Sequence, residues 1–307
     1  MLELLKKPNI DFIGKKYITI IVTGTLSILG IIAIIQIAAG KANMGIDFAG
    51  GTEIQLRFEK PVSLQSVRSA LETGGVKGFE LQDIPAENKV MIKTKQSEGD
   101  LSKISDTITS TLNQSMSGNK YIVDSTTAIG PKVGAKLRSD SVKAIIMATI
   151  GILIYVAVRF KFQFGVGATI ATFHDVLAIL GIFYLMGKEI NLIVISALLT
   201  IAGYSLTDTV VVYDRIRENL KIQLREPLPN VINNSINEVL SRTIITSLTV
   251  FFAAAALFFL GGEVIHDFAL IMLLGVIIGT YSSIFVASPI LLLWKKNGLL
   301  LLLRSEG

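Results

Sequence analysis

The amino-acid sequence predicts an α-helical membrane protein with six transmembrane helices and an α+β, ferredoxin-like domain outside the membrane. Three observations support this fold class. Hydrophobic residues make up 51% of the 307 positions, more than an ordinary soluble protein carries. Six segments are apolar over about 20 residues, the length that crosses a bilayer. The long stretch between the first two segments instead shows the alternating and helical patterns of a folded domain.

The six apolar segments differ in length and in their flanking charges. The second and fifth are short and need Lys143 and Arg242 at their ends to reach the headgroups. The first has no charged residue over its whole length, which is long for a cleaved signal peptide and predicts an uncleaved signal anchor. The predicted spans are Tyr17–Ala39, Val142–Val158, Phe162–Met186, Ile190–Tyr213, Ile244–Leu260 and Phe268–Trp294.

Lys and Arg residues predict the orientation in the membrane, because they are enriched in the short loops on its cytoplasmic side. The two short loops on one side, around 187–189 and 261–267, hold only Lys188. The other side holds Lys6, Lys7, Lys15, Lys16, Arg159, Lys161, Arg215, Arg217, Lys221, Arg225, Arg242, Lys295, Lys296 and Arg304. We therefore expect a multi-pass protein of the cytoplasmic (inner) membrane, with both termini cytoplasmic and the large first loop external. The net charge of +5 then belongs to the inner membrane face, and no nucleic-acid partner is expected.

This orientation divides the chain into a cytoplasmic N-terminus with the first span (1–40), an external domain (41–140), the remaining spans (141–294) and a cytoplasmic tail (295–307). Within the third part, residues 214–242 form a charged loop whose apolar residues recur at helical spacing. Pro227 and Pro229 interrupt this pattern. It predicts two amphipathic helices that lie along the inner membrane surface.

The external domain is predicted to have the order β-α-β-β-α-β, which is the ferredoxin-like split arrangement. Ile54, Leu56 and Phe58 alternate along the first strand, as expected when one face is buried. Ser63 can cap the first helix, which ends before Gly74. The predicted strands are 52–58, 78–84, 89–94 and 120–128, and the predicted helices are 64–73 and 97–115, the second after a Ser97/Asp100 capping pair.

Composition and motifs exclude several kinds of chemistry. The chain has no cysteine, and its two histidines, His174 and His266, are too few for a histidine-built metal centre. The glycine-rich segment Gly45–Gly51 precedes a strand rather than a helix, so it fails the test for a phosphate-binding loop and is interpreted as the turn that leaves the first span. We expect no metal, no cofactor and no nucleotide hydrolysis.

Asp208 is the principal candidate site residue. It lies inside the fourth apolar segment, about 8 Å below the charged edge at about 1.5 Å per residue. A carboxylate at that depth is costly, so it predicts an ion or proton site. Ser196, Thr200, Gly203, Tyr204, Thr207 and Asp208 share one helix face, which indicates a wetted or protein-lined path. The alternative is that the span ends at Thr207 and leaves Asp208 at the headgroups.

Other spans carry further candidates. His174 and Asp175 lie near mid-membrane in the third span, either as a structural pair or as part of a proton relay. Arg242 opens the fifth span at about the depth of Asp208, so it either pairs with that acid or only adds to the inner positive charge. Gly275, Gly279 and Ser283 recur every four residues in the sixth span and predict a helix-packing face.

Several stretches together resemble the SecF family, the smaller partners of the bacterial SecD–SecF protein-export pair. They are Gly45–Gly51, Gly130–Gly134, Phe173–Val176, Asp208–Asn219, Ser241–Thr243 and Gly279–Pro289, in the family's order. The resemblance implies half of an RND-type transporter that works with a SecD-like partner, the SecYEG channel and a translocating unfolded polypeptide. It also implies a role in proton movement for the residues that match the family's acid and arginine, Asp208 and Arg242.

Three functions remain open from the sequence. The first is a subunit that uses the proton motive force to promote late steps of protein export across the cytoplasmic membrane, and not an enzyme. The second is a structural or assembly subunit without proton conduction, in which Asp208 and Arg242 lock two helices together. The third is half of a small-molecule exporter, although a domain of about 100 residues leaves little room for a docking funnel.

Overall fold

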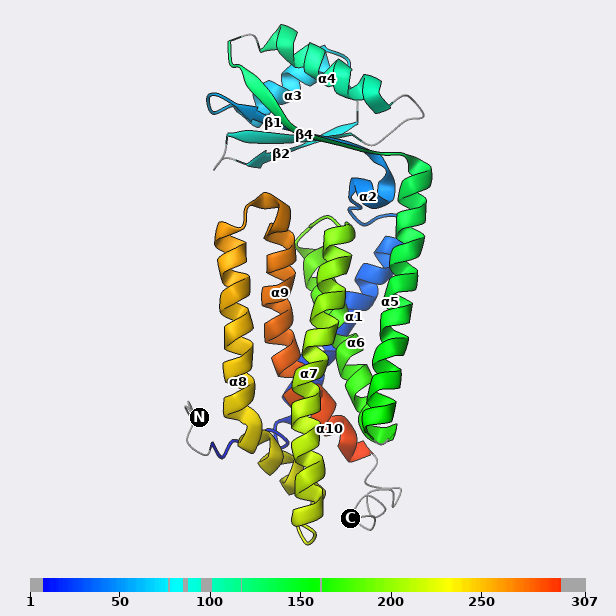
Figure 1. The fold of residues 1–307 in the computed structure, drawn as a ribbon, viewed down its shortest axis with the longest axis vertical. Coiled ribbons are helices and arrows are strands. Elements are labelled where there is room, and N and C mark those ends of the chain that lie inside the picture. The colour runs from blue at the N-terminus through cyan, green and yellow to red at the C-terminus, as the bar shows by residue number, and fades with distance from the viewer. Residues whose placement is uncertain are drawn as a thin grey trace. The chain divides into compact units, whose positions relative to one another are not determined.

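The computed structural model describes residues 8–76, 78–84, 88–94, 101–116, 118–160 and 162–293. These residues form two compact units. One holds the long helices, and the other consists of Asn43–Lys143 together with Glu189–Leu192. Figure 1 shows the first unit as a bundle of helices and the second as a small sheet with helices on it.

Within the described residues, six helices are long and apolar enough to cross a membrane, which confirms the predicted number of spans. The last of them continues into a π-helical turn, Ser283–Ala287, and the short helix α10, Ser288–Ile290. The six helices are α1 (Lys16–Ala38), α5 (Pro131–Arg159), α6 (Phe162–Leu185), α7 (Leu192–Ile222), α8 (Leu228–Leu260) and α9 (Glu263–Ser282). The predicted charge groups at 1–7, Lys161 and 294–307 lie outside the described residues.

Three helices extend well beyond the predicted spans. α5 begins at Pro131 rather than Val142, α7 runs on to Ile222, and α8 already starts at Leu228. The structure therefore corrects the prediction of two separate amphipathic helices on the membrane surface. The charged residues within α7 and α8 interrupt the apolar pattern but not the helices, and the only break in this segment is the short connection 223–227.

The extended ends of α7 and α8 bury their apolar residues against each other and against the N-terminal segment. The buried cluster there includes Phe12, Ile216, Leu220, Val231, Ile232 and Ile236. Asn233 and Asn237 accept hydrogen bonds from the backbone amides of Phe12 and Ile10, each at 2.9 Å. The apolar stripe that predicted contact with the membrane surface is thus used for packing within the protein.

Helices α1 and α6 cross closely because each has a glycine at the crossing. A Cβ atom on Gly30 would lie 2.3 Å from the carbonyl oxygen of Leu177, and one on Gly181 would lie 2.6 Å from the Gly30 nitrogen. Small residues let two backbones approach in this way, which is how helices pack in a bilayer where the lipid is as apolar as the side chains. Most of the remaining surface of α1 is exposed isoleucine, as expected of a lipid-facing helix.

The domain predicted at 41–140 has the predicted element order, and its sheet confirms the ferredoxin-like split. The strand order is β2-β3-β1-β4, and all three strand pairs are antiparallel. The elements are β1 (Gly51–Phe58), α3 (Leu64–Thr73), β2 (Phe79–Ile84), β3 (Lys89–Thr94), α4 (Leu101–Ser115) and β4 (Tyr121–Ile129). The proposed Ser97/Asp100 capping pair lies outside the described residues.

Alternation along β1 builds the core of this domain. Ile54, Leu56 and Phe58 are buried under α3 and α4, together with Leu71 and Leu112 (Figure 1). Because successive strand residues point to opposite faces, the intervening Glu53, Gln55 and Arg57 lie on the other face of the sheet.

The glycine-rich segment after α1 is more than the predicted turn. Ile46–Ala49 forms a short helix, α2, and Gly50 and Gly51 follow with φ of 76° and 145°. Both values favour glycine, and a Cβ on Gly51 would lie 2.3 Å from the carbonyl oxygen of Thr94. The segment meets residues 190–192, because Gly45 and Ile190 are joined by a backbone hydrogen bond of 3.0 Å.

Asp47 and Lys93 add side-chain contacts at the same place. The Asp47 carboxylate accepts a hydrogen bond of 3.0 Å from the amide of Leu192, the first residue of α7. Lys93 lies 2.6 Å from Glu189 and 3.8 Å from Glu53. Burial raises the pKa of Glu53 and the nearby carboxylates of Glu189 and Asp47 raise it further, while Lys93 opposes the rise. Glu189 is therefore the stronger ionic partner of Lys93.

Replacing Asp47 with alanine is expected to loosen the first turn of α7. An N-terminal helix turn has amides without intrahelical partners, and loss of a capping carboxylate costs about 1 kcal/mol, or about fivefold in local opening. Hydrogen–deuterium exchange of the full-length protein should show this acceleration at the start of α7. Ser63→Ala is the matched control, because Ser63 caps α3 by accepting from Ser66 at 3.1 Å and should affect only α3. Equal exchange at the start of α7 in wild type and Asp47→Ala would refute the capping role.

Candidate functional site

Asp208 is buried where α7, α8 and α9 meet. The residue is 5% exposed, so its carboxylate lies among the helices and not on the outer surface of the bundle. Ser247 of α8 donates a hydrogen bond of 3.2 Å to the carboxylate. The Ser247 hydroxyl also lies 2.7 Å from that of Thr280 on α9, which in turn donates to the carbonyl oxygen of Val276 at 2.8 Å. One acid is thus linked through hydroxyl groups to two further spans.

Arg242 does not meet Asp208 in this structure. Its side chain is exposed, and it forms no ion pair within the described part of the chain. The reason is the rotation of α8: at about 100° per residue, Ser247 lies about 140° around the helix from Arg242, so only one of them can face Asp208. The expected carboxylate–guanidinium contact is therefore corrected to a carboxylate–hydroxyl contact.

The predicted polar stripe of α7 divides into a buried and an exposed part. Asp208 is buried, and the hydroxyl of Tyr204 is also buried and lies close to Ser247. Ser196, Thr200, Gly203 and Thr207 are exposed. Thr200 and Thr207 donate to carbonyl groups of their own helix, at 2.8 and 2.7 Å. The stripe is thus an outer face of this chain, with the acid just beneath it.

The outer face continues onto α8. Arg242, Thr246 and Thr249 are exposed there, and both threonines donate to carbonyl groups of their own helix. Hydroxyl groups that are satisfied within their own helix can lie in an apolar environment at little cost. The face is therefore compatible with burial against another membrane protein.

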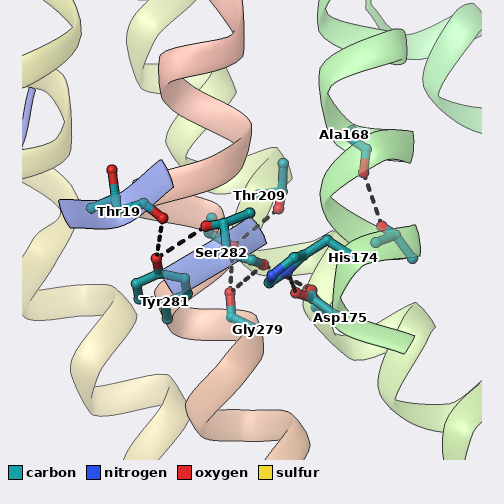
Figure 2. A network of polar contacts seen from close by, with 12 residues as sticks. Thr19, Ala168, His174, Asp175, Thr209, Gly279, Tyr281 and Ser282 are labelled. Carbon is teal, nitrogen blue, oxygen red and sulfur yellow. Dashed lines mark hydrogen bonds and ion pairs between the residues drawn. The ribbon is translucent and has the colours of Figure 1, made fainter. Parts of the chain in front are cut away.

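His174 and Asp175 form a second polar cluster with α7 and α9. Asp175 is fully buried and has three donors around it: His174 at 3.1 Å, Ser282 at 2.8 Å, and Ser205. Figure 2 shows His174 and Asp175 of α6 beside Ser282 and Gly279 of α9. The second ring nitrogen of His174, Nε2, is buried without a hydrogen-bond partner in the described structure. Three donors from three helices compensate a buried carboxylate, which supports the structural interpretation of this pair.

The small residues of α9 lie against α7. A Cβ on Gly275 would lie 2.0 Å from the side chain of Ile201, and one on Gly279 would lie 3.1 Å from Ser205. Ser283 lies 3.0 Å from the hydroxyl of Thr209. Close approach at these positions brings the hydroxyls of α9 within reach of the two acids.

Sequence analysis missed the serines and threonines that contact the acids. Ser205, Ser247, Thr280 and Ser282 are ordinary residues for membrane helices, and their partners lie between 30 and 107 positions away in the chain. Spacing along one helix does not identify them, since Ser205 precedes Asp208 by one turn but donates to Asp175 of α6. Which hydroxyl meets which acid depends on helix rotation, and the sequence pattern does not give that rotation.

These features define a membrane transport protein with six apolar helices in its described residues, a ferredoxin-like domain and carboxylates buried between the helices. Residues 107–297 match the family model of the protein export membrane protein SecD/SecF, C-terminal, and residues 40–62 match the SecD/SecF GG motif. The protein translocase subunit SecF of Thermodesulfovibrio yellowstonii is 58% identical over 303 residues, covering 98% of this chain and 99% of that protein. SecF of Calditerrivibrio nitroreducens is 43% identical over 299 residues, covering 96% and 97%. The chain belongs to the SecD/SecF family of protein export membrane proteins, and within it to the SecF subunits.

The structural comparison agrees with this assignment. A crystal structure of SecDF, a translocon-associated membrane protein from Thermus thermophilus, matches with a TM-score of 0.81 at 37% identity. The match covers 94% of this chain and 39% of the SecDF chain, so this chain spans about two fifths of that protein. A second SecDF structure, in a super-membrane-facing form, matches with a TM-score of 0.68. A SecD-type partner in the Sec translocase follows from this relationship.

Proposed function

We propose that this SecF subunit uses the proton motive force, together with its SecD-type partner, to promote late steps of protein export across the cytoplasmic membrane. The observation that carries the proposal is the burial of Asp208 between three spans without a basic partner among the described residues. An acid in that position is costly to keep, and ionisable residues inside membrane proteins mark ion or proton pathways. Asp208 is the proton carrier, with Tyr204 and Thr207 on the same helix face.

The SecD-type partner covers the exposed polar face of α7 and α8. Thr200, Thr207 and Thr246 would then lie at the subunit interface, where Arg242 can reach the entrance to Asp208 when the helices rearrange. This places the proton path between the two subunits, as expected when polar groups of membrane helices face another protein rather than lipid. The SecYEG channel and the translocating unfolded polypeptide are the further partners, and both termini are cytoplasmic.

The energy available fits this role. One charge that crosses a potential of about 100 mV supplies about 2.3 kcal/mol, enough to bias a two-state rearrangement about fiftyfold. A purely structural lock between Asp208 and Arg242 is the second candidate. It is disfavoured because Arg242 is exposed and pairs with no acid in the described residues. A structural role fits His174 and Asp175 better, although both remain candidates for the relay.

Inverted membrane vesicles that contain this subunit, its SecD-type partner and the Sec channel test the proposal. A proton gradient should increase export above the level of vesicles that lack this subunit, and a protonophore should remove the increase. Stimulation that is equal with and without the protonophore would show that the subunit acts without the gradient, as the structural alternative requires.

A further inference from the structure

The hydroxyl groups around Asp208 form a chain of hydrogen-bond contacts, and this chain has fewer donor hydrogens than contacts. Three contacts link the Asp208 carboxyl to Ser247, Ser247 to Thr280, and Thr280 to the carbonyl oxygen of Val276, at 3.2, 2.7 and 2.8 Å. Each contact needs one hydrogen. Ser247 and Thr280 supply one hydrogen each, and a carbonyl oxygen supplies none.

The two protonation states of Asp208 therefore satisfy the chain differently. When the carboxyl is protonated, it donates to Ser247, Ser247 donates to Thr280, and Thr280 donates to Val276, so that all three contacts are hydrogen bonds. When the carboxyl is ionised, it accepts from Ser247, and one contact of Thr280 is left without a hydrogen. The bond between α8 and α9 is then lost, or Thr280 must release the carbonyl of its own helix.

No other described charged group replaces the missing hydrogen. The buried hydroxyl of Tyr204, on the helix of Asp208, lies close to Ser247, and its one hydrogen can serve only that additional contact. The contacts therefore still outnumber the hydrogens when Asp208 is ionised. Arg242 of α8 is exposed. On α9, the hydroxyl of Tyr281 bonds to the backbone of Thr19 at 3.1 Å. Asp175 of α6 is bonded to its own set of donors. The competition is therefore confined to Asp208, Ser247 and Thr280.

The position of Thr280 gives this competition a mechanical consequence. It lies three residues before the π-helical turn at Ser283–Ala287, where the backbone already departs from α-helical hydrogen bonding. Single π turns are common at functional sites in helices, because they allow a helix to shift locally. A change at Thr280 thus occurs next to the part of the last span that is best able to rearrange.

We propose that Ser247 and Thr280 are positioning residues that convert the protonation state of Asp208 into a change of hydrogen bonding on α9, next to its π-helical turn. Protonation satisfies all the contacts and holds the three helices together, and loss of the proton removes one bond, either between α8 and α9 or between Thr280 and the Val276 carbonyl. This inference rests on the proposed proton-carrying role of Asp208.

Two substitutions test it through opposite effects on the pH profile of gradient-driven export in the assembled complex. Thr280→Val removes the competitor, so ionised Asp208 keeps the Ser247 hydroxyl without breaking another bond, and the midpoint should move to lower pH. Ser247→Ala removes the donor to the ionised acid, and the midpoint should move to higher pH. One hydrogen bond corresponds to shifts of about 0.5 to 1 pH unit. Thr280→Ser should restore the wild-type profile.

Thr243→Val is the matched control. Thr243 also lies on α8 and its hydroxyl is buried, but it has no hydrogen-bond partner in the described structure, so its removal should leave the profile unchanged. Profiles of Thr280→Val and Ser247→Ala that coincide with wild type overturn the inference, even when Asp208→Asn abolishes stimulation. Full stimulation by Asp208→Asn instead overturns the proposed function. If Thr280→Val does not assemble, the absence of an upward shift in Ser247→Ala is sufficient to reject the inference.

Discussion

Asp208→Asn is expected to abolish the gradient-dependent part of export while the subunit still inserts and binds its partner. An amide has the size of the acid and can donate to Ser247, so it reproduces the protonated state and keeps the packing of α7 against α8. It cannot release a proton, and the approximately fiftyfold bias that the potential supplies is then lost. Export by inverted vesicles with and without a gradient measures the loss, and co-purification with the SecD-type partner measures assembly.

Asp214→Asn is the control for this experiment. Asp214 lies six residues further along α7, and its exposed carboxylate pairs with the exposed Arg159 at 2.8 Å. A surface pair of this kind contributes about 0 to 1 kcal/mol, so its removal should change neither assembly nor stimulation. If Asp208→Asn instead prevents co-purification of the partner and leaves proton flow intact, the acid is a structural lock and the transport mechanism is wrong.

Gly30→Leu is expected to have the largest effect on folding. The added side chain would begin 2.3 Å from the carbonyl oxygen of Leu177, and a backbone atom cannot move aside as a flexible side chain can. Overpacking of this kind costs at least about 2 kcal/mol, and here it separates α1 from α6. The purified full-length protein should unfold at a lower temperature and be recovered in lower yield. Thermal stability in detergent, followed by size-exclusion chromatography, measures both.

Gly24→Leu separates this steric effect from the general effect of removing a glycine. Gly24 lies on the same helix, and an added Cβ there would meet no atom within 4 Å. The leucine also favours the helix more than glycine does, so no loss of stability is expected. Equal melting temperatures for the two variants would show that the α1–α6 crossing does not depend on Gly30.

The sequence was sufficient for the parts of the fold that depend on local patterns. Six apolar segments gave the six spans, because lipid requires each crossing segment to be apolar over its whole length. Alternation at Ile54, Leu56 and Phe58 gave the first strand and its buried face, and the order of the elements gave the ferredoxin-like domain. Ser63 was identified as a cap because a serine before an apolar periodic stretch has a local function.

The boundaries of α7 and α8 were not predictable in the same way. Ile216 and Leu220 follow Asp214 and Arg215, so the apolar pattern ended where the charges began. The structure buries these isoleucine and leucine side chains against α8 and Phe12. A helical stripe indicates that a face is covered, but it does not indicate whether lipid or protein covers it.

The chain itself determined a membrane protein with six apolar segments, a separate α+β domain and an acid in the fourth span, since each of these follows from residue type and spacing along one segment. Only the tertiary structure decided which group meets that acid. Arg242 and Ser247 lie on different faces of α8, and the packing of α8 against α7 and α9 turns the serine inward and the arginine outward. Helix rotation is set by the combined packing of several segments, such as Gly275 and Gly279 against α7. The periodicity of any single segment leaves that rotation open.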